Sequence, residues 1–342
     1  MREKEGRMET THGIAAHARR IREEFRQMGA EGHRLRMPAA WRAPLLFASP
    51  HSGRVYTESF KAASPLPLRD LRRNEDALVD RLFESCVELG APLLEANFPR
   101  SYLDANRAAD DLPPEWVEPV TPVPGRPGLR GRGADKWVAD KRGGAPRRAR
   151  LGLGVVPLII DDRLAIYRHP PSREEALARV EALHGPYHAA LQELTERSVR
   201  EFGSCLLIDC HSMPGFAAGI PKSGMPKRGI PKRGTRRADI ILGDGHGRTA
   251  RARTLDMLES AFARRGYRVG RNHPYAGGYA TLHYGRPDRG VEAVQVEINR
   301  ELYLNRLTFR PRPGFETLAR DIRDICAELI EELAPRRIEA AE

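Results

Sequence analysis

Short apolar runs rich in β-branched residues recur along the chain and predict the strands of a sheet. Each run is bounded by Pro, Gly or charged residues, which are typical of turns. One run begins at Leu206 and continues through Asp209 and His211 before it breaks. The predicted strands cover residues 44–49, 92–98, 101–105, 153–160, 206–213, 239–243 and 291–298.

Helical spacing of apolar residues marks several of the segments between these runs. Leu71, Leu78 and Leu82 recur at helical spacing, and Gly90 supplies a stop. Residues 70–89 are therefore predicted to form one helix. The other predicted helices cover residues 14–28, 172–202, 247–265 and 316–333.

Ser172 is a typical N-cap for the helix predicted over residues 172–202. A serine oxygen at this position accepts a hydrogen bond from a backbone N–H of the first turn. We expect an interruption where Gly185 and Pro186 follow one another.

Strands and helices alternate over one continuous core, which predicts a single α/β domain. This domain covers residues 38–342 and follows an N-terminal extension, residues 1–37, whose charged start is a candidate for disorder. Two loops rich in basic residues, at residues 113–152 and 215–237, interrupt the domain as insertions.

The composition fits a cytoplasmic enzyme better than a membrane or secreted protein. Hydrophobic residues make up 40% of the chain and charged residues 30%. No apolar run approaches the roughly 20 residues that a membrane span requires, and the N-terminus lacks the apolar segment of a signal peptide. The four cysteines lack a metal or disulfide spacing, so we expect core thiols in a reducing compartment.

The net charge of +11 comes from the two insertions. Residues 126–150 hold nine Lys or Arg and two Asp, and residues 221–237 hold seven Lys or Arg and no acid, so they contribute +14 and leave the rest at −3. The second insertion repeats a five-residue Pro-Lys pattern three times, which is too short for a solenoid. Solvated loops are the favoured interpretation, and contact with small anions or polyanions is the alternative.

Polar residues at the ends of predicted strands suggest a metal site. His51 follows the strand over residues 44–49, and Asp209 and His211 share one face of theirs because side chains alternate along a strand. Zinc hydrolases use three His or carboxylate ligands and keep a position for water. His51 and His211 are the best pair, and either Asp76 or Glu75 would complete the set.

Other polar residues suit acid–base chemistry and substrate binding. Glu297 lies within an apolar run, where a carboxylate is either paired or poised as a general base. Arg107, which follows Asn106, is suited to a bidentate contact with a substrate carboxylate. His184 and His188 have the spacing of metal ligands on a helix, but the intervening Pro186 and the lack of an HExxH acid favour a packing or substrate-edge role.

Several further motifs follow one another along the chain. They are Ser49-Pro50-His51-Ser52-Gly53, Asp76-x-x-Val79-Asp80, Arg100-Ser101-Tyr102-x-x-Asp104-x-Asn106-Arg107, Pro186-Tyr187-His188, Asp209-Cys210-His211-Ser212-Met213-Pro214, Asp239-Ile240-Ile241-Leu242-Gly243-Asp244, Pro274-Tyr275-x-Gly277-Gly278 and Glu297-Ile298-Asn299-Arg300-x-Leu302-Tyr303. Taken together and in this order, they resemble the motifs of the N-formylglutamate amidohydrolase family. The resemblance implies a three-layer α/β/α sandwich around a mixed sheet, similar to the zinc exopeptidases. It also implies a zinc-dependent hydrolase of linear amides, which converts N-formyl-L-glutamate and water to formate and L-glutamate, a reaction type of histidine degradation.

The resemblance also implies a role for individual residues. His51 and His211 look like the metal-binding imidazoles of one zinc per chain, and Asp76 looks like the carboxylate ligand. Arg54 stands where a carboxypeptidase-type HxxE motif would place its acid, so Glu75 remains an alternative to Asp76.

Glu297 looks like the general base, and Asp209 looks like support for a ligand. The implied substrate-binding residues are Arg100, Asn106, Arg107, Tyr275, Gly277 and Gly278.

Two other functions remain open at this point. The same metal centre would serve a carboxypeptidase-like enzyme or a deacylase of another acidic N-acyl amino acid, and the long basic insertions favour a changed specificity. A non-enzymatic polyanion-binding protein is the third possibility, although the confinement of charge to loops argues against nucleic acid. The sequence leaves the resident metal and the oligomeric state open.

Overall fold

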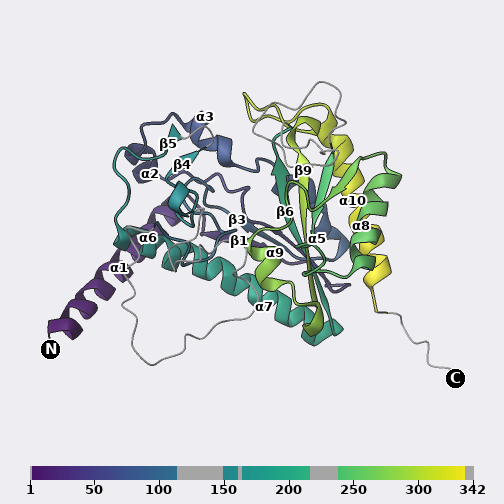
Figure 1. Cartoon of the computed structure of the whole chain (residues 1–342), viewed down its shortest axis with the longest axis horizontal. Coiled ribbons are helices and arrows are strands. Elements are labelled where there is room, and N and C mark those ends of the chain that lie inside the picture. The colour runs from purple at the N-terminus through teal and green to yellow at the C-terminus, as the bar shows by residue number, and fades with distance from the viewer. Residues whose placement is uncertain (1, 114–148, 161–163, 216–237, 336–342) are drawn as a thin grey trace. The chain divides into compact units, whose positions relative to one another are not determined.

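The computed structural model describes residues 2–113, 149–160, 164–215 and 238–335 (Figure 1). These fall into two compact units. Unit 1 comprises Met1–His33, Gly53–Glu75 and Asn97–His188, and unit 2 comprises Arg34–Ser52, Asp76–Ala96 and Ala189–Glu342. The single catalytic domain expected from the sequence stays a prediction. The repeat within residues 215–237 and most of the insertion at 113–152 lie outside the described residues.

A seven-stranded mixed sheet confirms the α/β class. Its order is β1-β3-β2-β6-β9-β7-β8. The pairs β2–β3, β2–β6, β6–β9 and β7–β8 are parallel, and β7–β9 is antiparallel. The strands are β1 (His33–Arg36), β2 (Leu45–Ser49), β3 (Leu93–Ala96), β6 (Cys205–Met213), β7 (Ile240–Gly243), β8 (Val269–Arg271) and β9 (Val291–Asn299).

One face of this sheet packs into the main hydrophobic core of unit 2. Alternate residues of the central strands, such as Phe47, Ile208 and Val296, point into it and are almost fully buried. Because side chains alternate, every second residue of a strand is available to this face. The helices on this face are α4 (Val79–Phe83), α5 (Ser85–Leu89), α8 (Ala252–Arg264) and α10 (Gly314–Leu333) (Figure 1).

The opposite face of the same strands is polar near the middle of the sheet. The β6–β9 register pairs Asp209 with Gln295 and His211 with Glu297, so these four side chains share a face. All four are buried. The short helix α9 (Tyr279–Tyr284) packs against β6 and β9 here. The prediction that Asp209 and His211 share one face is confirmed.

Unit 1 is mostly helical in its described residues. Ser172 forms a capping box with Glu175 at the start of α6, which confirms the predicted N-cap. The predicted interruption takes the form of a π-helical turn, Val180–His184, immediately before Gly185. Its other elements are α1 (Arg2–Gln27), α2 (Glu58–Ala63), α3 (Leu68–Leu71), the hairpin β4 (Ile159–Ile160) and β5 (Leu164–Ala165), α6 (Arg173–Arg179) and the first residues of α7 (Gly185–Phe202). Short 3₁₀ turns at Arg72–Asn74 and Ala149–Leu151 belong to unit 1, and those at Pro287–Arg289 and Arg300–Leu302 belong to unit 2.

The single helix predicted over residues 70–89 is wrong. The chain leaves helical geometry at Glu75, which is extended, and Leu78 has a φ of +67°. The N–H of Asp76 donates instead to the carbonyl of His51 at 2.9 Å. This tertiary hydrogen bond takes the place of a helical one and breaks the helix at Asp76. The leucines on either side of the break keep helical spacing in the sequence, although they do not belong to one helix.

Two predicted strands are also wrong or shorter than expected. Residues 101–105 form turns, because the N–H of Tyr102 donates to Pro99 O and Asp104 Oδ1 accepts from the N–H of Asn106. The strand predicted over residues 153–160 is reduced to the two residues of β4.

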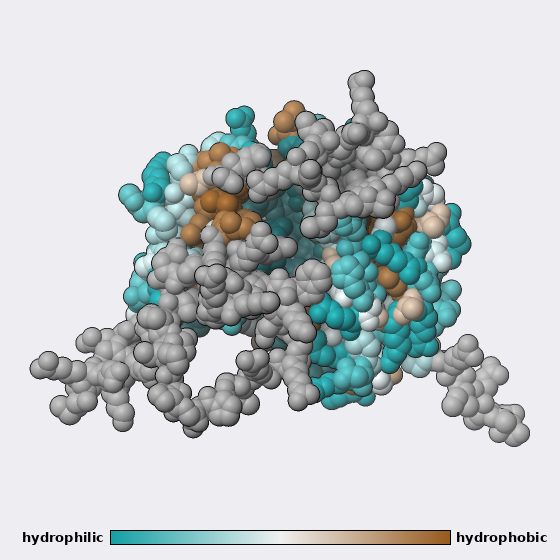
Figure 2. Space-filling view, in the orientation of Figure 1, coloured by the Kyte–Doolittle hydropathy of each residue, from teal (hydrophilic) through white to brown (hydrophobic). Residues whose placement is uncertain are grey.

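Among the coloured residues on the face shown in Figure 2, hydrophilic side chains predominate, and apolar side chains gather in smaller groups between them. No helix in the described part of the chain is long and apolar enough to cross a membrane.

Candidate metal centre

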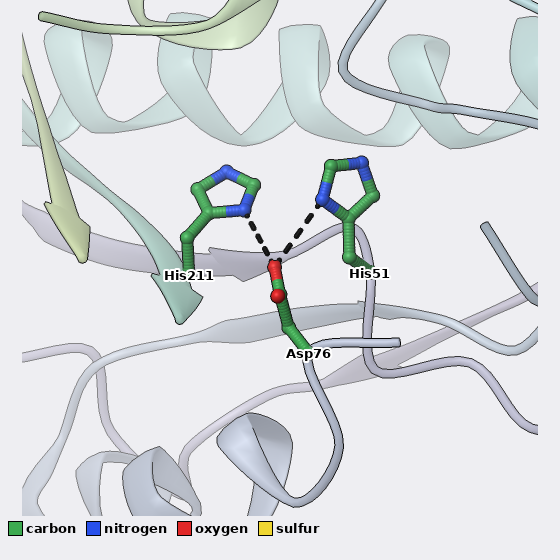
Figure 3. A group of neighbouring side chains, drawn as sticks. All are labelled: His51, Asp76 and His211. Carbon is green, nitrogen blue, oxygen red and sulfur yellow. Dashed lines mark hydrogen bonds and ion pairs between the residues drawn. The ribbon is translucent and has the colours of Figure 1, made fainter. Parts of the chain in front are cut away.

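Two imidazoles and one carboxylate of unit 2 converge at the polar face of the sheet (Figure 3). Asp76 Oδ2 lies 3.3 Å from His51 Nδ1 and 3.0 Å from His211 Nδ1. The two rings are 4.8 Å apart between centroids. All three side chains are buried, with exposed fractions of 3% or less. The predicted convergence of His51 and His211 is confirmed.

Each of these three residues belongs to a different part of the backbone of unit 2. His51 follows the end of β2, and His211 lies in β6, the strand paired with β2. Asp76 occupies the break that replaced the predicted helix, and its N–H is bonded to the carbonyl of His51. The break therefore holds the carboxylate beside the strand end.

Asp76 uses its two oxygens for different partners. Oδ2 faces the histidines, whereas Oδ1 accepts hydrogen bonds from Arg300 Nη2 at 2.6 Å and Ser212 Oγ at 3.0 Å. Burial alone would raise the pKa of the Asp76 carboxyl, but its contacts with His211 and His51 and the charge of Arg300 outweigh it and hold the pKa well below its usual range. Asp76 is therefore an ionised, oriented ligand candidate.

His211 is oriented through its other ring nitrogen. Nε2 lies 2.9 Å from Asp209 Oδ1, and Nδ1 lies 3.0 Å from Asp76 Oδ2. In the tautomer whose Nε2–H donates to Asp209, the lone pair of Nδ1 is available to a cation on the side of Asp76. Burial lowers the pKa of this imidazole, but Asp209 and then Asp76 outweigh burial and raise the pKa well above its usual value. The two carboxylates thus favour positive charge at this position, carried either by a proton or by a cation.

The donor set fits a divalent transition metal. Two imidazole nitrogens and a carboxylate oxygen, mutually within 4.8 Å, match the three protein ligands of a catalytic zinc site. The carboxylate that orients His211 matches the outer support that metal-bound histidines usually have. Within the described residues, this is the one group of His, Cys, Asp and Glu side chains that meets the geometry for a metal ion.

Glu75, the alternative to Asp76, has other partners in unit 1. Arg72 binds both of its carboxylate oxygens, with Nε at 3.0 Å from Oε1 and Nη2 at 3.1 Å from Oε2. Tyr56 donates its hydroxyl to Oε1 at 2.7 Å. The geometry therefore favours Asp76 over Glu75 as the carboxylate ligand.

Glu297, the predicted general base, is the neighbour of His211 on the adjacent strand, because the β6–β9 register pairs the two residues. Its Oε1 accepts a hydrogen bond from Gln295 Nε2 at 2.7 Å, and the side chain is 6% exposed. Glu297 thus shares the face of the candidate metal centre, and its catalytic role stays a prediction.

The predicted carboxylate-binding residues lie in unit 1. Arg100 Nε donates to Asp104 Oδ2 at 3.0 Å, and Arg107 donates through Nε to Leu153 O and through Nη1 to Asn106 O. The Asn106 backbone is capped by Asp104, so these residues form one ordered turn.

His184 and His188 support this turn, in line with the favoured packing role. His184 Nε2 lies 2.9 Å from Arg107 O, and His188 Nε2 lies 2.8 Å from Ala105 O. The two rings are neighbours, with centroids 4.3 Å apart. Both imidazoles therefore contact the backbone of the turn that carries Asn106 and Arg107.

The predicted substrate loop precedes α9 in unit 2. Gly277 has a φ of +131°, a conformation that side-chain-bearing residues rarely adopt. Gly278 is the N-cap of α9, and Tyr275 packs against a small apolar cluster that contains Met213 and Ile241. These residues lie on the polar side of the sheet, whereas their contact with substrate stays a prediction.

Sequence reasoning missed the residues that hold the ligands. Arg300 and Ser212 occur in the motifs that carried the family resemblance, but they had no assigned role. Arg300 bonds Ser212 through Nε at 2.9 Å, so the two bind Asp76 as a pair. Thr281, which donates to Asp209, carries no sequence signal because a lone threonine in a helix is unremarkable.

The sheet and the buried ligand group together define a mixed α/β protein with a potential metal centre at strand ends, an arrangement suited to hydrolases. The chain belongs to the N-formylglutamate amidohydrolase family, whose model matches residues 43–304. This confirms the family resemblance and assigns the chain to a family of hydrolases.

Named relatives agree with the family assignment. N-formylglutamate deformylase of Pseudomonas aeruginosa is 28% identical over 295 residues, which cover 85% of this chain and 93% of the relative. The same-named protein of Pseudomonas putida is 25% identical, with 85% and 92% covered. The crystal structure of N-formylglutamate amidohydrolase from Ralstonia eutropha matches with 32% identity and a TM-score of 0.73, covering 88% of this chain and 98% of that one. A protein from Agrobacterium tumefaciens, at 15% identity and a TM-score of 0.56, shares the fold.

Proposed function

We propose that this protein hydrolyses N-formyl-L-glutamate to formate and L-glutamate. The carrying observation is the buried group of His51, Asp76 and His211 on the polar face of the sheet. The family assignment and the activities named for the relatives support the same reaction. The proposal includes a cytoplasmic location, supported by four buried free cysteines, and the three-layer arrangement of the zinc exopeptidases.

One zinc ion per chain is proposed, held by the two imidazole Nδ1 atoms and Asp76 Oδ2. Bound zinc would supply Lewis acidity, which polarises a carbonyl and acidifies a water molecule. The chain supplies the orientation. Arg300 and Ser212 hold the carboxylate, and Asp209 holds the ring of His211.

Glu297 is proposed to move the proton. Its carboxylate would accept the proton of the attacking water and pass it to the leaving nitrogen as the C–N bond of the formamide breaks. Oxygen then stays on the formyl carbon, which leaves as formate, and the amine is released as glutamate. This role is supported by the pairing of Glu297 on β9 with His211 on β6, which places both side chains on the same face of the sheet.

Substrate binding is assigned to two groups of residues. Arg100, Asn106 and Arg107 are proposed to bind the carboxylate of glutamate, because guanidinium and amide donors match carboxylate oxygens. The loop with Tyr275, Gly277 and Gly278 is proposed to contact the substrate.

The test is a substrate panel on the purified, metal-loaded chain. Formate release from N-formyl-L-glutamate is compared with product release from N-acetyl-L-glutamate, N-formyl-L-methionine and a dipeptide with C-terminal glutamate. Chelation should abolish turnover and zinc should restore it. Preference for the acetyl compound or the dipeptide would replace the proposed substrate, and undiminished turnover in zinc-free protein or in His211→Ala would contradict the metal centre.

A further inference from the structure

Thr281 connects α9 to the hydrogen bonds that orient the metal-binding imidazole. The residue is fully buried, at 0% exposure. Its Oγ1 donates to Asp209 Oδ2 at 3.1 Å, and the other oxygen of the same carboxylate accepts from His211 Nε2 at 2.9 Å. Thr281 is therefore two hydrogen bonds away from the Nδ1 atom that faces Asp76.

The other side of Thr281 packs against the predicted substrate loop. A Cβ built at Gly277 would lie 3.1 Å from Thr281 Cγ2, so the backbone of the loop and the threonine methyl are in close contact. The N–H of Leu282 donates to Gly278 O at 3.1 Å and fastens the end of the loop to the first turn of α9.

The beginning of the loop is also fixed. The N–H of Gly245 donates to Ala276 O at 2.6 Å, and Asn272 Nδ2 donates to Asp244 Oδ1 at 2.7 Å. A side chain at Gly243 would collide with the backbone of Ala276, at 2.7 Å. The loop is anchored at both ends, so Thr281 packs against a well-defined surface.

We propose that Thr281 is a positioning residue, which orients the Asp209 carboxylate and, through it, the metal-binding nitrogen of His211. The inference rests on the proposed metal centre. A carboxylate that accepts from two fixed donors on its two oxygens has one preferred rotation, whereas the loss of one donor frees that rotation. The methyl group of the same residue supports Gly277, so the imidazole and the loop share one support.

The experiment measures zinc affinity of the full-length chain by competition with a chromophoric chelator. Thr281→Val keeps the shape of the side chain and removes the donor, so its zinc affinity should fall about tenfold or more. Thr281→Ser keeps the hydroxyl and should bind zinc like the wild type.

Thr249→Val is the matched control. Thr249 is also buried, and its Oγ1 donates to the backbone carbonyl of Ala293 at 2.7 Å instead of to the Asp209 carboxylate. The same donor is lost, so thermal unfolding of the metal-free proteins should show similar destabilisation in Thr249→Val and Thr281→Val. Only the latter should lose zinc affinity.

A double-mutant cycle with Asp209→Ala tests the route of the effect. If Thr281 acts through Asp209, Thr281→Val adds nothing to the affinity loss of Asp209→Ala. Additive losses, equal losses in Thr249→Val, or unchanged affinity in Thr281→Val would each overturn the inference. Absence of zinc binding in the wild type would overturn the proposed metal centre and this inference with it, whereas normal wild-type binding with an unaffected Thr281→Val would overturn only the inference.

Discussion

The two faces of the central sheet use the same strands for different purposes. On β6, Ile208 and Cys210 point into the apolar core, while Asp209 and His211 point to the candidate metal centre. On β9, Val296 and Glu297 divide in the same way. Since neighbouring residues serve opposite faces, a register slip of one residue would exchange core and site. The core thus fixes the register on which the site depends.

The largest expected effect comes from Glu297→Gln on the polar face. Without a proton acceptor, kcat should fall by about 10²–10⁴-fold, while zinc content and folding stability change little. Glu292→Gln is the matched control, because it is the same substitution on the same strand and Glu292 is bonded to Arg251 and Thr254 instead. Steady-state formate release checks the difference, and full activity in Glu297→Gln would reject the assigned role.

Phe47→Ala, on the apolar face, should lower the folding stability and leave kcat nearly unchanged, which is the reverse of the effect expected for Glu297→Gln. Phe47 is 1% exposed and packs beside Phe83, with ring centroids 5.7 Å apart. The cavity and the lost burial should cost about 3–5 kcal/mol in the free energy of unfolding. Urea unfolding measures this cost, and kcat of the molecules that remain folded should stay near the wild-type value. A selective loss of kcat without loss of stability would contradict the division between the faces.

Ile208→Val is the milder test beside the site. Ile208 precedes Asp209 and is 1% exposed, so removal of one methylene should cost about 0.5–1.5 kcal/mol. Because its side chain points away from His211, zinc affinity should not change. A drop in zinc affinity in this variant would show that the two faces are not independent.

The smallest expected effect depends on pH. Burial alone would raise the pKa of Glu292, but hydrogen bonds from Thr254 and Arg251 outweigh it and lower the pKa below its ordinary value of 4.5. A carboxylate with a lowered folded-state pKa stabilises the fold above the unfolded pKa, and this contribution is lost as the pH falls through the folded pKa. Glu292→Gln should therefore cost about 0.5 kcal/mol at neutral pH, a modest value because Arg251 is half exposed and screened.

Urea midpoints of the wild type and Glu292→Gln, compared at neutral pH and in acid below the folded-state pKa, check this prediction. The gap between the two proteins should close in acid. A gap that persists or widens there would show that the carboxylate does not stabilise the fold through its charge.

The strand ends and their faces could be predicted because they depend on local alternation. Apolar runs that end in His51 or in Asp209 and His211 reveal both the strands and the polar face, since the period of a strand is two. The choice between Asp76 and Glu75 could not be made. It depends on a hydrogen bond between Asp76 and the carbonyl of His51, which breaks a helix that the leucine spacing predicts.

The residues that bind the candidate ligands could not be predicted from the sequence for a different reason. Arg300 and Asp76 are 224 positions apart, and Thr281 and Asp209 are 72 apart. Such contacts exist only once the strands have paired, and no periodicity within one segment contains them. The motifs of the family included Arg300 by position, yet only the folded chain shows which oxygen it binds.

The guanidinium of Arg300 has a consequence for biosynthesis. A ribosome makes the chain from the N-terminus, so His51, Asp76 and His211 are all synthesised before Arg300. The guanidinium of Arg300 donates a hydrogen bond to Asp76 and carries the opposite charge. A nascent chain that has not yet produced β9 would bury an ionised carboxylate with an incomplete set of partners, which is costly. The set of partners of Asp76 is therefore complete only after Arg300 has been synthesised, and a chain truncated before Arg300 would keep the three candidate ligands without the guanidinium that binds Asp76 Oδ1.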